Sequence, residues 1–161
     1  MKIQSAHFGE VEISDQKILH FPEGLPGLED EQRFALLTVG DGQPINWLQS
    51  LNHEEIALPV LDPFVVNPSY AFDVRQEDID FLEISEMKDV YILSVLVIPS
   101  NVDDMTINLS APIIINVVNN RGRQICLDDK QYRVRTPVAQ LLRQATESGE
   151  EKHASADQET E

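Results

Sequence analysis

The residue types that could bind a metal are scattered along this chain. Its four histidines stand at positions 7, 20, 53 and 153, without His-x-His or His-x-x-x-His spacing, and it has one cysteine, Cys126. A zinc site built from imidazole and thiolate ligands therefore has little to draw on, and an internal disulfide is impossible. The pairs Asp103–Asp104 and Asp128–Asp129 lack the alternating oxygen ligands of a calcium loop. The sequence predicts neither a metal site nor a cofactor.

The candidate nucleophiles are equally isolated. Cys126 lies in the apolar run Ile125-Cys126-Leu127, where we expect a small buried side chain rather than a reactive thiol. The chain contains no Gly-x-Ser-x-Gly motif. A carboxylate-dependent hydrolase in a β-barrel stays open as an alternative function, because some of the 28 acidic residues must lie close together. It would require a pocket in which two carboxyl groups have separated pKa values. No residue qualifies as catalytic, and we expect a protein that is not an enzyme.

The net charge of −16 is unevenly distributed. Residues 1–110 carry 20 acidic and 5 basic side chains, residues 111–146 carry 2 and 6, and residues 147–161 carry 6 and 1. An acidic body repels nucleic-acid phosphates and attracts basic proteins. The net-basic segment, residues 111–146, leaves a second alternative function, which is direct RNA binding through the arginines of residues 121–143. However, Tyr132 is the only aromatic residue there that could stack on a base. We expect these arginines to lie on a solvated face or to pair with the acidic body, without direct nucleic-acid contact.

The segment from Asp73 to Asp89, DVRQEDIDFLEISEMKD, holds seven acidic and two basic residues. Ile79 and Leu82 are three residues apart and acidic residues precede them, which predicts a short amphipathic helix over residues 76–84. A proline-containing apolar stretch, residues 62–70, leads into it. This combination suits the docking of a basic or amphipathic protein segment. A surface helix whose apolar side packs on the domain explains the pattern equally well.

Most of the remaining chain has the pattern of short strands. Residues 8–13 alternate between polar and apolar, and residues 90–98 are apolar on both faces apart from Ser94, which is typical of a strand covered on both sides. About nine short strands with one or two small helices predict a mainly all-β fold, a small antiparallel β-barrel-like domain or a sandwich. The other expected strands are residues 18–21, 33–39, 45–51, 57–61, 106–110, 112–118 and 124–127, with a tight turn at residues 119–122.

The stretch FPEGLPGLED, residues 21–30, stands between two of these apolar runs. Its prolines restrict φ and remove hydrogen-bond donors, while its glycines permit left-handed geometry. A phosphate-binding loop would be followed by a helix and usually by Lys-Ser or Lys-Thr. Here an expected strand follows, and the acidic residues would repel a phosphate. We therefore expect this elbow to join two strands.

The chain length suits one domain over residues 1–146. Residues 137–145 have the composition of a short C-terminal helix with a proline in its first turn. Residues 147–161 contain no aliphatic side chain larger than alanine, so we expect a disordered acidic tail. The absence of a long apolar run, of a signal segment and of paired cysteines predicts a cytoplasmic protein without a membrane span. We expect it to be a monomer when alone.

Taken in order, several motifs resemble the FliW family of flagellar assembly factors. The resemblance covers roughly residues 1–138, and the FPEGLPGLED elbow and the APIIIN strand are its most specific parts. The motifs are Phe8-Gly-Glu-Val-Glu-Ile13, Ile18-Leu-His-Phe-Pro-Glu-Gly-Leu-Pro-Gly-Leu-Glu-Asp30, Asn46-Trp-Leu-Gln-Ser-Leu51, Asp62-Pro-Phe64, Tyr70-Ala-Phe-Asp73, Asn108-Leu-Ser-Ala-Pro-Ile-Ile-Ile-Asn116, Gly122-Arg-Gln-Ile-Cys-Leu-Asp-Asp129 and Tyr132.

The resemblance implies a non-enzymatic regulator with a small β-barrel-like fold. Such proteins bind CsrA, a basic RNA-binding protein that represses translation of flagellin mRNA, and antagonise it by contacting it away from its RNA surface. They also bind flagellin, and the two partners exclude one another. Charge density then leads us to expect CsrA contact through eight residues of the acidic segment and its approach: Phe64, Asp73, Glu77, Asp78, Asp80, Leu82, Glu83 and Glu86.

Overall fold

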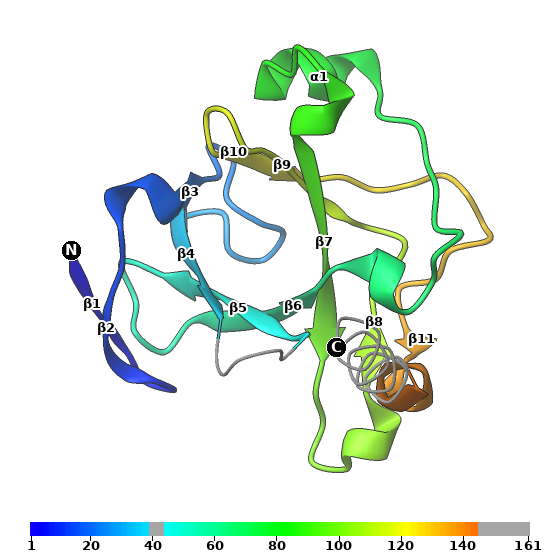
Figure 1. The fold of residues 1–161 in the computed structure, drawn as a ribbon, viewed down its shortest axis with the longest axis horizontal. Helices are drawn as coiled ribbons and strands as arrows, with labels where there is room; N and C mark the ends of the chain where they lie inside the picture. The colour runs from blue at the N-terminus through cyan, green and yellow to red at the C-terminus, as the bar shows by residue number, and fades with distance from the viewer. Residues whose placement is uncertain (39–43, 145–161) are drawn as a thin grey trace, which may run out of the picture.

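Seven strands close into a barrel in the computed structural model, which describes residues 1–38 and 44–144 (Figure 1). Their order around the barrel is β7-β6-β5-β4-β3-β10-β9, and pairing of β9 with β7 completes the ring. Neighbours are antiparallel except β3 and β10, which are parallel. Closure leaves the barrel without a free edge strand. The seven strands are β3 (Ile18–His20), β4 (Arg33–Thr38), β5 (Asn46–Ser50), β6 (Ala57–Leu61), β7 (Val90–Val97), β9 (Ile113–Asn116) and β10 (Arg121–Gln124).

Shorter elements surround this barrel. β1 (Lys2–Ser5) and β2 (Gly9–Glu12) form a separate hairpin, and β8 (Thr106–Ile107) and β11 (Thr136–Pro137) extend the sheet beyond β7. One α-helix, α1 (Gln76–Leu82), lies beyond one end of β7, and residues 139–144 are also helical (Figure 1). The 3-10 turns are η1 (Asp15–Lys17), η2 (Pro63–Val65), η3 (Met87–Asp89) and η4 (Val102–Asp104). Within the described residues, no helix is long and apolar enough to cross a membrane.

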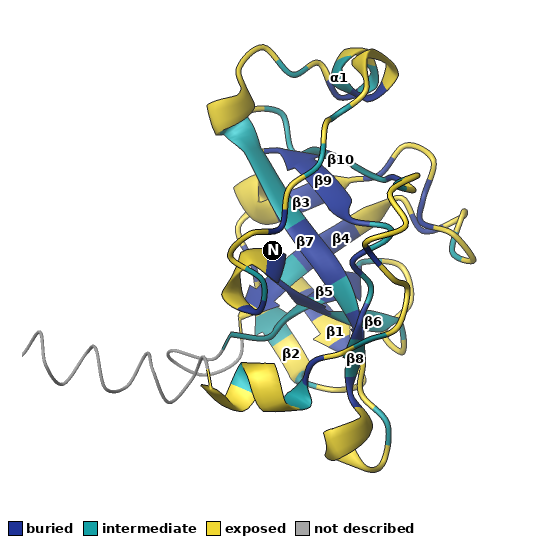
Figure 2. Cartoon of the chain, turned by 90° about the vertical axis from the view of Figure 1, so that its right-hand side faces the viewer, coloured by how far each residue is buried: buried dark blue, intermediate teal, exposed yellow. Residues whose placement is uncertain are grey.

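β7 and β9 are apolar on both faces because both faces are covered, whereas β10, with the sequence RGRQ, has no large apolar side chain. In β9, Ile113 and Ile115 belong to the main core cluster, while Ile114 between them packs with Leu82 of α1. In β7, Leu93 belongs to the main cluster and Leu96 to a second cluster outside it. Side chains alternate between the two faces of a strand, so β7 and β9 each contribute to two clusters. Figure 2 shows the resulting dark, buried centre under an exposed periphery. The expected mainly β, barrel-like fold is confirmed.

The FPEGLPGLED elbow joins β3 to β4, as expected. Gly24 and Gly27 both have positive φ, +67° and +83°. Leu25 and Leu28 form a bridge across the elbow, and Leu25 is buried with Phe21 in the main core cluster. The elbow is therefore part of the core as well as a connection.

Several sequence-based boundaries differ from the structure. β10 begins at Arg121, three residues before the expected start, so the expected turn glycine, Gly122, lies inside a strand. A Cβ atom on Gly122 would lie 2.4 Å from Cε1 of Phe21, which explains the glycine by close packing rather than by turn geometry. The positive φ of this hairpin belongs to Asn120. β8 covers only two of the five residues expected, β1 and β11 were not expected, and the acidic tail lies outside the described residues.

Candidate partner-binding surface

The acidic segment folds into α1 much as its pattern predicts, and the β9–β10 hairpin holds the end of the helix. Glu83 ends the helix in the left-handed conformation, with φ of 55°. Asn116 donates through Nδ2 to the carbonyl oxygens of Leu82 (2.9 Å) and Glu83 (3.1 Å), and Asn119 donates to that of Leu82 (3.2 Å). These bonds satisfy helix carbonyls that have no partner within the helix. The position of α1 is thereby fixed by side chains of the barrel.

Arg123 of β10 connects α1 to the elbow. Its guanidinium donates to Asp78 (3.0 Å) and, through two nitrogens, to both carboxylate oxygens of Glu23 (3.1 Å each). It also lies 3.6 Å from Glu77 and 4.2 Å from the ring centroid of Phe81. A planar guanidinium suits such combined ion pairing and ring stacking. One arginine thus holds two acidic side chains of the helix and one of the elbow.

Arg121 repeats part of this arrangement two residues earlier. It lies 5.3 Å from the ring centroid of Phe81 and 3.6 Å from the carboxylate of Glu83. Residues two apart in a strand share a face, so this alternation beside an acidic helix is a signal that sequence reasoning missed. Away from α1, Arg143 of the helical residues 139–144 pairs with Asp103 of η4. The expected ion pairs between the basic end and the acidic body are therefore present at these three arginines.

Two of the eight expected contact residues are inaccessible. Leu82 has 0% exposure and packs with Ile114 and Ile125, so it cannot serve as the apolar anchor expected of it. Asp78 has 7% exposure and is held by Arg123. Both face inward because the helix packs its apolar side on the barrel, which is the plainer of the two explanations for its pattern.

The other expected contact residues are exposed, but the structure does not gather all of them. Phe64 lies on η2, 5.9 Å between ring centroids from Tyr70, and Figure 1 places this part of the chain apart from α1. Asp73 precedes the helix and makes no hydrogen bond or ion pair with any described residue. Met87, exposed beside Glu86, is the large apolar side chain that the segment itself presents. The exposed acidic side chains on and after α1 are Glu77, Asp80, Glu83 and Glu86.

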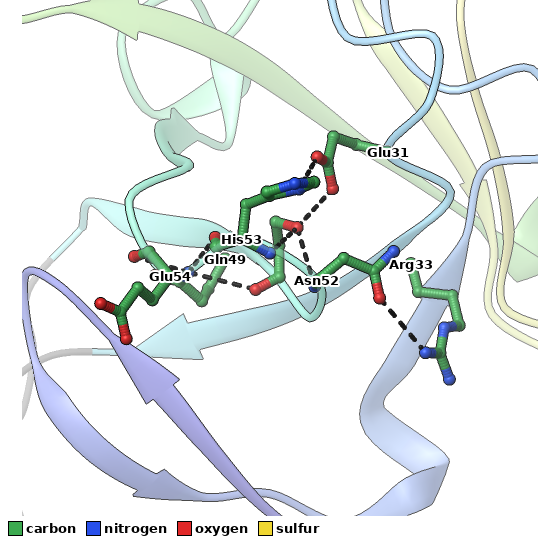
Figure 3. A network of polar contacts seen from close by, with 7 residues as sticks. Glu31, Arg33, Gln49, Asn52, His53 and Glu54 are labelled. Carbon is green, nitrogen blue, oxygen red and sulfur yellow. Dashed lines mark hydrogen bonds and ion pairs between the residues drawn. The ribbon is translucent and has the colours of Figure 1, made fainter.

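A Glu31–Ser50–His53 network at the β5–β6 end resembles a catalytic set, but its order is wrong. Glu31, with 3% exposure, accepts a 2.5 Å hydrogen bond from Ser50 Oγ and pairs with His53 Nδ1 (Figure 3). In a catalytic triad the histidine lies between the serine and the acid. Here the carboxylate lies between them, and no contact joins the imidazole to the serine hydroxyl among the described residues.

The same network has a clear structural role. Ser50 Oγ accepts from the backbone N–H groups of Asn52 and His53, both at 3.1 Å, and the Gln49 amide donates to three backbone carbonyls of residues 50–54. These bonds fix the turn after β5 by satisfying buried polar groups. The carboxylate of Glu31 ties this turn to the elbow that precedes β4.

Two further expectations about chemistry can be compared with the structure. Cys126 is exposed rather than buried, whereas its neighbours Ile125 and Leu127 are buried and half-buried, respectively. The alternation of side chains could have predicted this exposure. When the first and third residues of an extended run point toward the protein, the middle residue points away from it. No group of three or more His, Cys, Asp or Glu side chains in residues 1–38 and 44–144 could hold a metal ion.

Comparison with protein families gives a match to the model described as FliW protein, over residues 2–138. This chain belongs to the FliW family. A flagellar assembly factor FliW of Thermoanaerobacter pseudethanolicus is 38% identical over 146 residues, which cover 90% of this chain and 97% of the relative. One from Pseudothermotoga lettingae is 42% identical over 134 residues, covering 83% and 85%.

The fold comparison agrees with this membership. A crystal structure of the flagellar assembly factor FliW aligns with a TM-score of 0.79 at 33% sequence identity, covering 86% of this chain and 96% of the other. The FliW resemblance noted from the elbow and the APIIIN strand is confirmed. In this FliW-family chain those two motifs build the core, whereas α1 carries the exposed acidic side chains.

Proposed function

We propose that this FliW-family chain is a flagellar assembly factor that acts in the cytoplasm by binding, without catalysis. Its partners are flagellin and CsrA, and its binding antagonises CsrA allosterically and so relieves repression of flagellin translation. The family match supports the flagellar role. The net charge of −16 and the exposed acids of α1 support a basic partner, since opposite charges steer association.

The exposed acidic surface of α1 carries the CsrA part of the proposal. Glu77 forms an ion pair with Arg123, and Glu83 forms one with Arg121. Replacing either glutamate would therefore also disturb the fold of the segment. Among the described residues, the side chain of Asp80 is hydrogen-bonded only to Gln76 of the same helix, and Glu86 pairs with Lys88 two residues away. These two acids can therefore be exchanged with little effect on the rest of the molecule, and they provide the sharper test.

The test is the affinity of CsrA for an Asp80→Lys/Glu86→Lys variant, measured at about 50 and about 300 mM salt because screening separates charge from shape. We expect a loss of about tenfold or more at low salt and a smaller loss at high salt. The matched control, Asp30→Lys/Glu55→Lys, makes the same change in net charge at exposed positions elsewhere. Equal losses in the two variants would assign the effect to net charge and remove α1 from the CsrA contact.

The flagellin part is tested by co-purification of the intact chain from a lysate in which flagellin export is blocked. We expect flagellin to be recovered with the chain, and added flagellin to displace CsrA. Direct RNA binding through the 121–143 arginines is the alternative to be tested. If the chain alone, without CsrA, changes the gel mobility of RNA, that result would favour this alternative. Turnover of a hydrolysable substrate by the pure chain would favour the hydrolase alternative.

A further inference from the structure

A groove separate from the exposed face of α1 lies between residues 71–75 and residues 125–129. Its volume is about 570 Å³, which is within the range of pockets that bind small ligands or peptide side chains. Phe72, Ile125 and Leu127 supply its apolar lining. In Figure 1 the two segments are the green and yellow-orange chains to the right of β7 and β9.

One wall of this groove is an open edge of the β9–β10 hairpin. The backbone N–H groups of Ile125 and Leu127 donate to the carbonyls of Pro112 (3.0 Å) and Ser110 (2.8 Å). Backbone groups of successive residues in an extended chain point to opposite sides, so those of Cys126 point away from residues 110–112. They have no hydrogen-bond partner among the described residues. Such an edge can pair with an added strand.

The other wall is also extended and also unpaired. Residues 71–75 alternate in exposure, with Phe72 and Val74 half-buried between exposed neighbours. In the part of the chain that the structure describes, the backbone groups of Phe72, Asp73 and Val74 make no hydrogen bond. Both walls therefore offer backbone donors and acceptors to a third chain.

Both ends of this wall contact residues on other parts of the chain. The hydroxyl of Tyr132 accepts from the N–H of Ala71 at 3.0 Å and donates to its carbonyl at 3.1 Å. At the other end, Arg75 pairs with Asp128 at 2.5 Å across the groove. The two bonds to Tyr132 hold the Ala71 end of this wall, so that end needs little reordering when a ligand enters, which favours binding.

The charge of the groove selects the ligand. Three aspartates line it, at positions 73, 128 and 129, against the single basic side chain of Arg75. Since Arg75 is paired with Asp128, the carboxylates of Asp73 and Asp129 remain without a basic partner among the described residues. We infer that the groove binds an extended peptide segment of a partner protein in which lysine or arginine alternates with an aliphatic residue.

Each part of such a peptide has a counterpart in the groove. Its backbone pairs with the Cys126 edge, its aliphatic side chains contact Phe72 and Leu127, and its basic side chains face Asp73 and Asp129. A helix would fit less well, because its backbone groups are already paired and could not serve either wall. The groove lies next to the proposed CsrA contact on α1, and Asp73 belongs both to the groove and to the residues expected to contact CsrA.

Cys126 provides a built-in reporter, because it is the only thiol of the chain, is exposed and lines the groove. The probe is the blocked pentapeptide Lys-Val-Lys-Val-Lys, and the readout is the rate at which Cys126 of the full chain reacts with the neutral reagent N-ethylmaleimide. We expect saturable protection of the thiol. The peptide Glu-Val-Glu-Val-Glu and a Lys-Val-Lys-Val-Lys peptide with N-methylated valines should both protect at least about tenfold less well.

Two variants locate the site. Asp73→Asn/Asp129→Asn should raise the half-protecting concentration of the basic peptide about tenfold, because both basic side chains lose their partners. The control, Asp15→Asn/Asp30→Asn, changes the same number of exposed aspartates elsewhere and should leave it unchanged. The inference is overturned if the basic peptide gives no protection at millimolar concentration, if the acidic peptide protects equally well, or if both variants respond alike. These outcomes do not depend on binding of CsrA or flagellin.

Discussion

The elbow end of the barrel and the face covered by α1 are stabilised in opposite ways. At the elbow, Gly24 is in close contact with the backbone of Leu28 and Glu29, and Leu25 is buried in the main core cluster. Glu31, which follows the elbow, is buried in a hydrogen-bond network. On the α1 face, Arg123 holds exposed carboxylates of Glu23 and Glu77 together with the buried one of Asp78. Steric fit dominates the first region and charge the second.

The contrast between the two regions indicates which parts of the molecule can change their contacts. A residue in close steric contact cannot be released without loss of fold, because protein interiors are densely packed. An exposed ion pair contributes little to stability and can be exchanged for a pair with a partner. The two most specific family motifs, the elbow and the APIIIN strand, therefore belong to the core, and the exposed acidic side chains of α1 lie outside both.

The first and largest effect is expected in the elbow. A Cβ atom on Gly24 would lie 2.5 Å from the carbonyl oxygens of Leu28 and Glu29, whereas one on Gly27 would meet nothing within 4 Å. Both glycines have positive φ, so both alanine variants carry backbone strain of about 1–2 kcal/mol. The clash should bring the loss of unfolding free energy in Gly24→Ala to about 3 kcal/mol or more. Urea unfolding followed by Trp47 fluorescence measures both; equal losses would refute the steric account of the elbow.

Much of this fold follows from local pattern, and much of the site does not. Most strands and α1 could be predicted because the alternation or helical spacing of apolar residues is a property of neighbouring residues in the sequence. The prediction that residues 90–98 form a strand covered on both sides is correct, since Leu93 and Leu96 of β7 belong to different clusters. Gly122 was misassigned to a turn because the ring that requires its missing side chain, Phe21, is about a hundred residues away.

The same separation hides the organisation of the acidic surface. Charge density alone ranked Asp78 with its exposed neighbours, since nothing in residues 73–89 shows that Arg123 faces that one carboxylate. Leu82 was ranked as an exposed anchor because its burial depends on Ile114 and Ile125 of the barrel. The groove was missed for a related reason: its two walls, residues 71–75 and 125–129, are ordinary extended segments until the fold brings them together.

A second test addresses the α1 face. Arg123→Met keeps much of the side-chain length but leaves the carboxylate of Asp78, at 7% exposure, without its cation. We expect a loss of about 2 kcal/mol in unfolding free energy and faster hydrogen exchange in α1 than in β5. Arg75→Met removes the pair with exposed Asp128 and should cost less than about 0.5 kcal/mol. A loss at Arg123 no larger than that at Arg75 would place α1 among regions held by apolar packing alone.

The smallest effect concerns Tyr70, which precedes the wall formed by residues 71–75 and packs in the cluster outside the barrel that contains Leu96 and Leu109. Its hydroxyl is buried and donates to the carbonyl of Leu109 at 2.7 Å. Burial, followed by the neighbouring Tyr132, raises the pKa of Tyr70 above its usual value of 10.0. The folded state therefore favours the neutral phenol, and this contribution to stability is complete below pH 10 and is lost as the pH rises above it.

The unfolding free energy should consequently fall by about 1.4 kcal/mol per pH unit above pH 10 on account of this one group. Tyr70→Phe removes the titrating proton at the cost of one hydrogen bond, so it should be less stable than the parent at pH 8 and show a flatter decline above pH 10. Some decline remains in the variant because burial, and then Asp62, also raises the pKa of Tyr91. Parallel curves for the parent and the variant would mean that Tyr70 ionises as readily in the folded as in the unfolded chain.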